Sequence, residues 1–331
     1  MIRVHPSSAR LPLALAIPLA LLCGVGVSLQ SRINGELARE LGSGSAAALF
    51  SFGSGLIVLI VVVALSPTGR QGTRRLYVGV RRRTFPWYLL FGGCVGAFFV
   101  LSQGLVAGVL GIALFTVALV AGQTVGGAVL DRIGLGTMAP RPVTWNRVLG
   151  AVLALVAVTV AVSSQLRADA VLWGLLMPFI AGLFMAYQQG ANGQVREYTG
   201  SVMIATLNNF IVGTILLAVI ALVLGVATGW PTAWPADPLL YTGGVVGIVF
   251  IAIGAFVVST IGTLLLGLCT IAGELVAAVV LDLVVPVEGH TLTVTAVVGA
   301  GIALVAVFVA SIRHASDLRI QPAAELTPPA S

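Results

Sequence analysis

The stretch GQTVGGAVLD, residues 122–131, recurs 151 positions further along the chain as GELVAAVVLD, residues 273–282. Such self-similarity at a fixed offset indicates an internal repeat. The two stretches differ at the one polar position inside the apolar run, where Gln123 in the first is replaced by the ionisable Glu274 in the second. Two similar helices therefore differ by a single chargeable group.

Longer matches surround this stretch. Residues 89–131 share fifteen identities with residues 240–282, and residues 24–55 share ten with residues 182–213 at an offset of 158. Together these matches divide the chain into two copies. The boundaries that we expect are 1–10 for a cytoplasmic leader, 11–165 for the first copy, 170–312 for the second and 313–331 for a disordered tail.

The composition places both copies in a membrane. Hydrophobic residues make up 58% of the chain, charged residues 8%, and the mean hydropathy is +1.09, far more apolar than a soluble domain. A helix needs about 20 apolar residues to cross the hydrocarbon core. Ten runs fit, at residues 11–30, 44–65, 87–107, 110–130, 144–164, 171–191, 202–226, 239–258, 261–284 and 292–312. Because the first run is the counterpart of an internal one, we expect it to be retained rather than removed as a signal peptide.

The arginines predict the orientation. The 17 basic residues are all arginine, and with the N-terminus in the cytoplasm only Arg32, Arg39 and Arg167 fall outside. This bias favours two cytoplasmic termini in a plasma or inner membrane. The Arg-rich connection at residues 70–83 is short and lacks interleaved aromatic residues, so we expect it to meet anionic lipid headgroups rather than nucleic acid.

Each copy has an odd number of spans, which has a consequence for the architecture. The second copy must enter the membrane from the side opposite to the first, so the two five-helix repeats are inverted. Inverted repeats place a substrate near the midplane at their interface, and exchange of their conformations gives alternating access. The fold that we predict is an all-α bundle of ten transmembrane helices.

At this point a family resemblance can be stated. The two sets of five spans, the polar first helix with Gln30 and Asn34, and the run GQTVGGAVLDRIGLGTMAPRPVTWNRVLGAVLALVAV from residue 122 resemble the drug/metabolite transporter superfamily, and within it the fused form of the YdcZ-like branch. The resemblance covers about residues 11–315 and implies a solute transporter with a cavity between the halves. Half-sized multidrug members of the superfamily couple to protons through a first-helix glutamate. Here Glu36 lies past Asn34 at the outer edge, so that role does not transfer to this position.

Amide side chains are the candidates for lining the cavity. Gln30 and Asn34 are four residues apart, as are Gln188 and Asn192, so each pair shares one helix face. We expect both pairs to line the cavity, with hydrogen bonding between helices as the alternative. Gln123 is expected to face the cavity from the fourth span.

The seventh span adds two more amides to these candidates. Asn208 and Asn209 stand where the first copy has Phe50 and Ser51. This difference suggests contact with substrate, and bonding between helices is an equal alternative.

Glu274 is the candidate coupling group. It is the one ionisable residue well inside a predicted span, where an unpaired charge costs at least ~3 kcal/mol. We therefore expect it to be protonated when occluded and to release a proton when the cavity opens or a cationic substrate arrives. The alternative is a neutral Glu274 that bonds to Gln123 or to a backbone carbonyl and has a packing role only.

Small residues recur beside these polar groups. Gly122 and Gly126 in the first copy correspond to Gly273 and Ala277 in the second, and we expect them to allow close helix packing. The aspartates that end the two stretches, Asp131 and Asp282, are expected to cap a helix or to pair with an arginine rather than to do chemistry. The three cysteines fit no metal motif and are expected to pack within the bundle.

The function that these features favour is secondary transport, with proton-coupled export of a small metabolite or an amphipathic or cationic compound as the leading hypothesis. An enzyme is disfavoured, because His5, His290 and His314 lie in termini or loops and no P-loop is present. A lipid-handling or structural subunit without ion coupling is the remaining alternative. No cofactor or metal is expected. The substrate, the direction of transport and the choice between a monomer and a homodimer stay open.

Overall fold

A computed structural model describes residues 11–99, 102, 112–135, 140–163, 172–284 and 293–312. These residues form helices joined by short connections, with no strand among them. The first copy contributes α1 (Leu13–Leu41), α2 (Gly44–Leu65), α3 (Pro67–Arg81), the 3-10 turn η1 (Trp87–Phe91) with a helix that continues to Phe99, α5 (Ile112–Ile133) and α6 (Trp145–Ala161). The second contributes η3 (Leu172–Leu175), α7 (Leu176–Thr199), α8 (Val202–Thr228), η4 (Pro238–Tyr241), α9 (Gly243–Val284) and α10 (Val294–Ser311).

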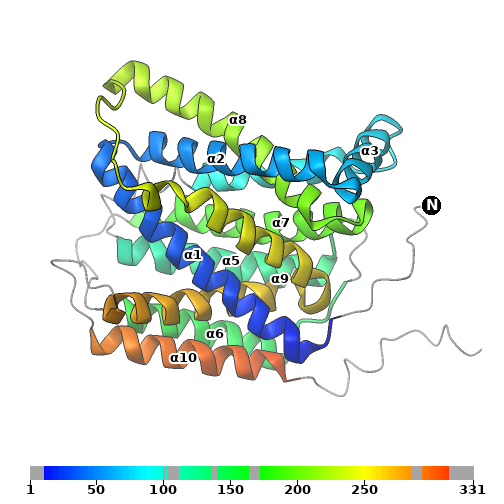
Figure 1. The fold of residues 1–331 in the computed structure, drawn as a ribbon. Coiled ribbons are helices and arrows are strands. Elements are labelled where there is room, and N and C mark those ends of the chain that lie inside the picture. The colour runs from blue at the N-terminus through cyan, green and yellow to red at the C-terminus, as the bar shows by residue number, and fades with distance from the viewer. Residues whose placement is uncertain are drawn as a thin grey trace, which may run out of the picture.

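The helices run roughly side by side in one bundle, with α3 at one end (Figure 1). Within the described ranges, α1, α2, α8, the segment Pro238–Leu281 and α10 are long and apolar enough to cross a membrane, and Trp87–Phe99 and α6 are shorter apolar helices. The predicted spans therefore correspond to helices of an all-α membrane bundle built from two inverted five-helix repeats. The leader, the tail and the three histidines lie outside the described residues.

Two predicted boundaries were wrong. The first span does not stop near Gln30 but continues as α1 to Leu41, where Gly42 ends the helix in the left-handed conformation at φ 62°. The Arg-rich connection is not a loop but the helix α3, which begins because Ser66 accepts a hydrogen bond from the Gly69 amide and Pro67 occupies the first turn. Polarity concealed both helical segments, since hydropathy detects only the part of a helix that lies in lipid.

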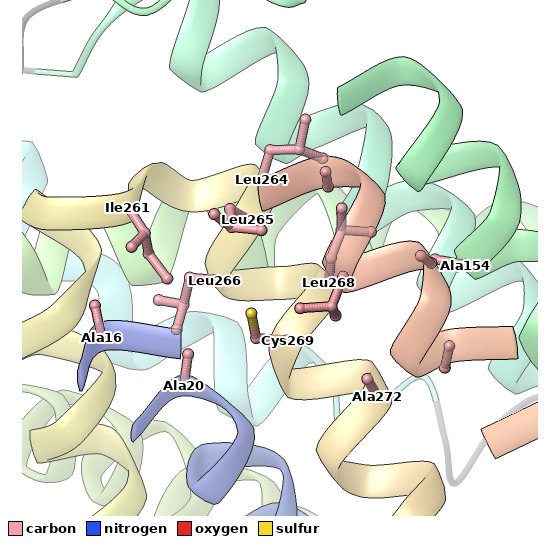
Figure 2. Packing of buried hydrophobic residues seen from close by; sticks show 14 of the residues in the cluster. Ala16, Ala20, Ala154, Ile261, Leu264, Leu265, Leu266, Leu268, Cys269 and Ala272 are labelled. Carbon is pink, nitrogen blue, oxygen red and sulfur yellow. The ribbon is translucent and has the colours of Figure 1, made fainter. Parts of the chain in front are cut away.

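Small side chains lie between the helices and large ones point away from the bundle. On α10, Ala303 and Ala306 are 1% and 0% exposed, whereas Phe308 is 68% exposed. Small residues between helices and large apolar residues on the outer surface are typical of a bundle that is surrounded by lipid. Figure 2 shows the central cluster, where Ala16 and Ala20 of α1 pack beside Leu266 and Cys269 of α9. Cys23 and Cys269 are both buried, in agreement with a packing role.

The contacts between the copies repeat the offsets of the sequence. A methyl group added at Gly24 of α1 would collide with the Thr270 carbonyl of α9, and one added at Gly182 of α7 would collide with the Leu119 carbonyl of α5. Residues 24 and 182 are 158 apart, and residues 119 and 270 are 151 apart, as in the two sequence matches. The pairs α1–α9 and α7–α5 are therefore equivalent crossings related by a pseudo-two-fold axis.

The fifth and tenth spans meet in the same symmetric way. A methyl group at Gly150 of α6 would lie 2.8 Å from the Ala306 carbonyl oxygen of α10, and one at Gly299 of α10 would lie 2.6 Å from the Ala157 carbonyl oxygen of α6. Both helices of this pair thus pack through the same small-residue face. The repeat seen in the sequence is a repeat in three dimensions.

A break divides α9 into the predicted eighth and ninth spans. Gly262 has φ 84° and ψ 171°, values outside the helical region that favour glycine. A methyl group here would also lie 2.6 Å from Oδ2 of Asp131, so the close approach of this carboxylate requires glycine as well. The predicted boundary between residues 258 and 261 lies within a few residues of this break.

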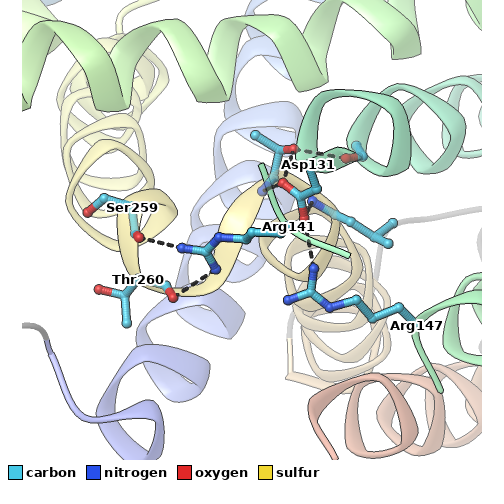
Figure 3. Close-up of polar contacts among 8 residues, drawn as sticks. Asp131, Arg141, Arg147, Ser259 and Thr260 are labelled. Atoms are coloured by element: carbon cyan, nitrogen blue, oxygen red, sulfur yellow. Dashed lines mark hydrogen bonds and ion pairs between the residues drawn. The ribbon is translucent and has the colours of Figure 1, made fainter. Parts of the chain in front are cut away.

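Asp131 at the end of α5 caps the helix that starts after the break (Figure 3). Its Oδ1 accepts hydrogen bonds from the Thr263 amide at 2.7 Å and the Thr263 hydroxyl at 2.8 Å, and its Oδ2 accepts one from the Leu264 amide at 3.3 Å. These amides are unsatisfied at a helix N-terminus, where a negative charge is favourable. Arg147 of α6 forms an ion pair with Oδ2 at 3.2 Å. Asp131 thus has both predicted roles, capping and pairing.

Arg141 completes this connection from the other side of the break. Its guanidinium donates to the carbonyls of Ser259 at 2.6 Å and Thr260 at 3.0 Å, the last turn before Gly262 (Figure 3). A cation is favourable at a helix C-terminus, just as an anion is at an N-terminus. The connection between α5 and α6 in the first copy therefore holds both helix ends of the break in the second copy.

Candidate functional site

The amides of α1 lie in a polar group in the second half of that helix. Gln30 donates a hydrogen bond from Nε2 to the Gly243 carbonyl at 2.8 Å. A methyl group at Gly243 would collide with Oδ1 of Asn34 and would lie 3.1 Å from Oγ of Ser51. Both oxygens are buried, and neither has a hydrogen-bond partner in the part of the chain that the structure describes. We call these four residues the α1 amide group.

The amides of α7 lie in the equivalent group. Around Gly92, a methyl group would lie 3.4 Å from Oδ1 of Asn192, 3.5 Å from Oδ1 of Asn209 and 3.6 Å from Cγ of Gln188. Gln188 donates from Nε2 to Oδ1 of Asn209 at 3.2 Å. The Nδ2 atom of Asn209 is buried, and none of the described residues accepts a hydrogen bond from it. We call these four residues the α7 amide group.

The two amide groups lie on either side of a pair of aromatic rings. Phe52 follows Ser51 and Phe210 follows Asn209, and the two ring centroids are 5.2 Å apart. A methyl group at Gly247 would collide with Nε2 of Gln30 and would lie 3.3 Å from the Phe210 ring. In Figure 1 α1 ends at the left and α7 ends at the right beside α3, so the two helices that carry the groups run in opposite senses. The structure therefore distributes the predicted cavity amides over two symmetric positions. Ser51, Gly92 and Gly243 were absent from the prediction, yet their pairing at the repeat offsets was a signal that could have found them.

The hydrogen bonding of the groups is not symmetric. Gln30 bonds across the copies to Gly243 of α9, whereas Gln188 bonds within its own copy to Asn209 of α8. The counterpart of the Gln30 bond would be a bond from Gln188 to the carbonyl of Gly92. Asn208 reaches across the copies instead, because its Nδ2 donates to the Leu90 carbonyl at 2.9 Å. The two groups therefore share a glutamine, an asparagine and a glycine, differ at Ser51 and Asn209, and are joined differently.

Gln123 lies deep in the bundle and faces α9. The side chain is 5% exposed, and a methyl group at Gly267 would lie 3.3 Å from its Nε2. This nitrogen is buried and has no hydrogen-bond partner among the described residues. Gln123 is therefore a buried amide that can still donate a hydrogen bond.

Glu274 occupies the equivalent position at the α1–α9 crossing. Its backbone nitrogen would lie 2.5 Å from a methyl group at Gly24, and its side chain is partly exposed. Gln123 faces Gly267, which is seven residues or about 10 Å of helix away from Glu274. A hydrogen bond from Gln123 to Glu274, the packing alternative drawn from the sequence, is not formed.

The small residues of the repeated stretch lie where helices touch. A methyl group at Gly122 would collide with the Phe179 carbonyl of α7, and one at Gly273 would collide with the Leu21 carbonyl of α1. At Gly126 it would lie 3.0 Å from the Leu183 carbonyl oxygen, and Ala277 is 5% exposed. These contacts hold Gln123 and Glu274 at matching heights of the two crossings.

The sequence of this bundle matches a known family of membrane proteins. The profile of the family described as "Putative inner membrane exporter, YdcZ" matches residues 15–160 and 173–309. The chain belongs to the YdcZ family. Membership places it in the YdcZ-like branch of the drug/metabolite transporters, a family of multi-pass exporters of the inner membrane and not of enzymes.

Solved structures agree on the fold of this YdcZ family member. One structure, described only as "Crystal structure of protein", superposes with a TM-score of 0.57 at 16% sequence identity and covers 90% of this chain and 95% of its own. At this identity the likeness concerns the fold alone. No curated protein matches the chain.

Proposed function

We propose that this protein exports a small metabolite, or an amphipathic or cationic compound, by alternating access coupled to protons. The observation that carries the proposal is the unequal bonding of two equivalent amide groups. An inverted repeat in which the copies differ in conformation is open at one end and closed at the other, and exchange of the two conformations reverses access. The bond from Gln30 to Gly243 joins the two copies, and the equivalent bond of Gln188 stays within one copy.

The amide groups also provide the polar contacts that a substrate needs. Buried amides without partners are costly, so a ligand that supplies a donor or an acceptor gains from meeting them. Within the described ranges, the α1 amide group has two atoms without a partner: Oδ1 of Asn34, which favours a donor on the substrate, and the Ser51 hydroxyl, which can donate or accept. In the α7 amide group, the corresponding atom among the described residues is Nδ2 of Asn209, which favours an acceptor. A polar or cationic compound with both kinds of group fits this distribution.

Glu274 is the proposed coupling group. It is an ionisable residue within an apolar helix, at the crossing of α1 and α9, where movement of the two copies changes its surroundings. A carboxyl group at such depth is neutral when closed off from water and ionises when water or a cation reaches it. Release of the proton on one side and uptake on the other would couple export to the proton gradient.

The orientation that we propose places both termini in the cytoplasm. The end of the bundle that carries α3, Arg141, Arg147 and Arg196 is the more basic one, and basic residues favour the cytoplasmic side. The C-terminal end of α1 then lies at the outer face. A reporter domain that is active only in the cytoplasm should therefore be active when it is fused after Ile312. An inactive reporter at this position would refute this topology.

The test of coupling is Glu274→Gln in sealed proteoliposomes. A thermal-shift screen of the purified protein with amino acids, polyamines and cationic dyes first identifies a bound compound, because binding raises the stability of the folded state. With that compound, the wild type should show transport driven by a pH gradient, and Glu274→Gln should lose the dependence on the gradient. The thermal midpoint of the variant is the control for folding. Unchanged gradient-driven transport in a folded Glu274→Gln protein would exclude Glu274 as the coupling group.

A further inference from the structure

The helix α3 carries an unusual concentration of positive charge. Residues 67–83, which include α3 and the two residues after it, contain six arginines and no acidic residue. All six are exposed, and Arg70 and Arg75 use their guanidinium groups to bond the carbonyls of Ala64 and Thr199 at 2.7 Å and 3.3 Å. Among the described residues, none is hydrogen bonded to the other four side chains. These are Arg74, Arg81, Arg82 and Arg83.

The opposite face of α3 is docked on the second copy. A methyl group at Gly72 would lie 2.8 Å from the Ile204 side chain of α8, and one at Gly79 would collide with the Tyr198 ring of α7. Leu76 and Val80 pack against a buried cluster that includes Ile204. The helix is therefore held in a fixed place, and its arginines form a surface of defined shape rather than a freely moving chain.

The position of α3 is that of a helix at a membrane surface. It follows α2 directly, and Leu65, the last residue of that apolar helix, is 76% exposed. Tyr77, Trp87 and Tyr88, on and just after α3, are 63%, 66% and 44% exposed. Exposed aromatic rings beside a transmembrane helix end are typical of the headgroup region.

A hollow lies within this surface. It has a volume of about 400 Å³ and is lined by Tyr77, Val78, Arg81 and Arg82. Two guanidinium groups provide the planar donor forks that suit phosphate oxygens. The tyrosine ring and the valine add apolar surface to the lining, which suits the start of an acyl chain. The hollow thus combines the two parts of a phospholipid at one place.

From these observations we propose that α3 binds the headgroup of an anionic phospholipid, with its phosphate against Arg81 and Arg82 and its glycerol beside Tyr77 and Val78. A zwitterionic lipid carries a compensating cation that six arginines repel, so anionic lipid is the preferred partner. The site is independent of the transport path, because it lies on the outside of the bundle at the end of α7.

The test uses the full chain in nanodiscs. Nanodiscs of phosphatidylcholine are compared with nanodiscs that also contain phosphatidylglycerol, and both the thermal midpoint and the phosphatidylglycerol that stays bound in native mass spectrometry are measured. The wild type should gain stability from phosphatidylglycerol and retain bound lipid. Arg81→Gln with Arg82→Gln should weaken retention about tenfold or more, since each basic residue near an anionic surface contributes substantially to binding.

Matched variants separate this site from a general effect of charge. Arg32→Gln with Arg39→Gln removes the same charge from the α1 end and should leave retention unchanged, and Arg81→Lys with Arg82→Lys should retain part of the binding. Equal lipid retention in the Arg81 and Arg82 glutamine variant would overturn the proposal. So would equal stabilisation of the wild type by inorganic phosphate in phosphatidylcholine nanodiscs, or tighter binding to a nucleic-acid duplex than to the lipid.

Discussion

The crossing of α1 with α9 and the crossing of α7 with α5 have the same backbone geometry and different chemistry. In each, a glycine of one helix meets a backbone carbonyl of the other and a second glycine returns the contact. In one crossing the next residue is the buried amide of Gln123, and in the other it is the partly exposed carboxyl of Glu274. The comparison teaches that the repeat preserves helix packing, whereas the chemistry differs at one equivalent position, where we propose that the coupling group lies.

The largest expected effect comes from breaking the packing that both crossings share. Gly24→Val and Gly182→Val each place side-chain atoms against a carbonyl that cannot move without separation of the helices. We expect little folded protein from either variant, as measured by size-exclusion chromatography in detergent.

Gly35→Val is the matched control, since no atom lies within 4 Å of a methyl group there. It should be recovered at nearly the wild-type yield. A normal elution profile for Gly24→Val would contradict the close crossing.

The second prediction concerns the cap at the break in α9. Asp131→Ala removes the acceptor for two backbone amides and leaves Arg147 without its partner, so the free energy of unfolding should fall by about 3–5 kcal/mol. Asp131→Asn keeps an acceptor and should lose less. Chemical denaturation in detergent measures both, and an equal loss in the two variants would show that the ion pair with Arg147, not the cap, carries the stability.

The third prediction exchanges the chemistry of the crossings. The double variant Gln123→Glu with Glu274→Gln moves the carboxyl group to the position that is 5% exposed. Because water reaches this position less readily, we expect the variant to lose gradient-driven transport and to be destabilised by about 3 kcal/mol. Transport at the wild-type rate in proteoliposomes would show that either crossing can couple protons.

The smallest effects are expected from the amide groups. Asn34→Leu and Asn192→Leu each remove one amide from an equivalent position, and each should change stability by only about 1 kcal/mol while slowing transport. Since the groups are bonded differently, one variant should alter the apparent affinity for substrate offered from the inside, and the other the apparent affinity for substrate offered from the outside. Identical transport kinetics on both sides of the membrane would argue against a role for the amides as alternate contacts.

Much of the fold could be predicted from the sequence, because a chain that crosses the hydrocarbon core must do so as long apolar helices. Apolar runs, the odd number of spans and the repeat offsets were enough for ten spans and inverted copies. The offsets also contained the crossings, since Gly24 and Gly182 meet residues of the repeated stretch. Helical segments outside lipid were missed, as α3 and the end of α1 show, because their polar composition resembles that of a loop.

The candidate site was less accessible from sequence. Asn34 and Asn192 could be selected as polar residues in spans, but their separation into two groups depends on how the helices pack in space. The sequence predicted that Asp131 caps a helix or pairs with an arginine, but it did not predict which groups Asp131 meets. Its partners at Thr263 and Leu264 lie 132 and 133 residues away. The unequal bonding of Gln30 and Gln188 belongs to one conformation of the protein and could not follow from a sequence in which the two residues are equivalent.

The packing of α1 on α9 and of α7 on α5 has a consequence for biosynthesis. Each copy gives its first helix to the other copy, so the groove that receives α1 is not made until residues 263–284 have been synthesised. Until then α1 lies in the membrane without the partner that packs on Gly24. This partner, α9, is the last helix but one to be synthesised. Such long-range pairing slows folding and prolongs exposure of the unpaired surface. If the two copies were inserted separately, each would lack the helix that fills its groove. Coexpression of the two halves should restore the fold that neither half forms alone.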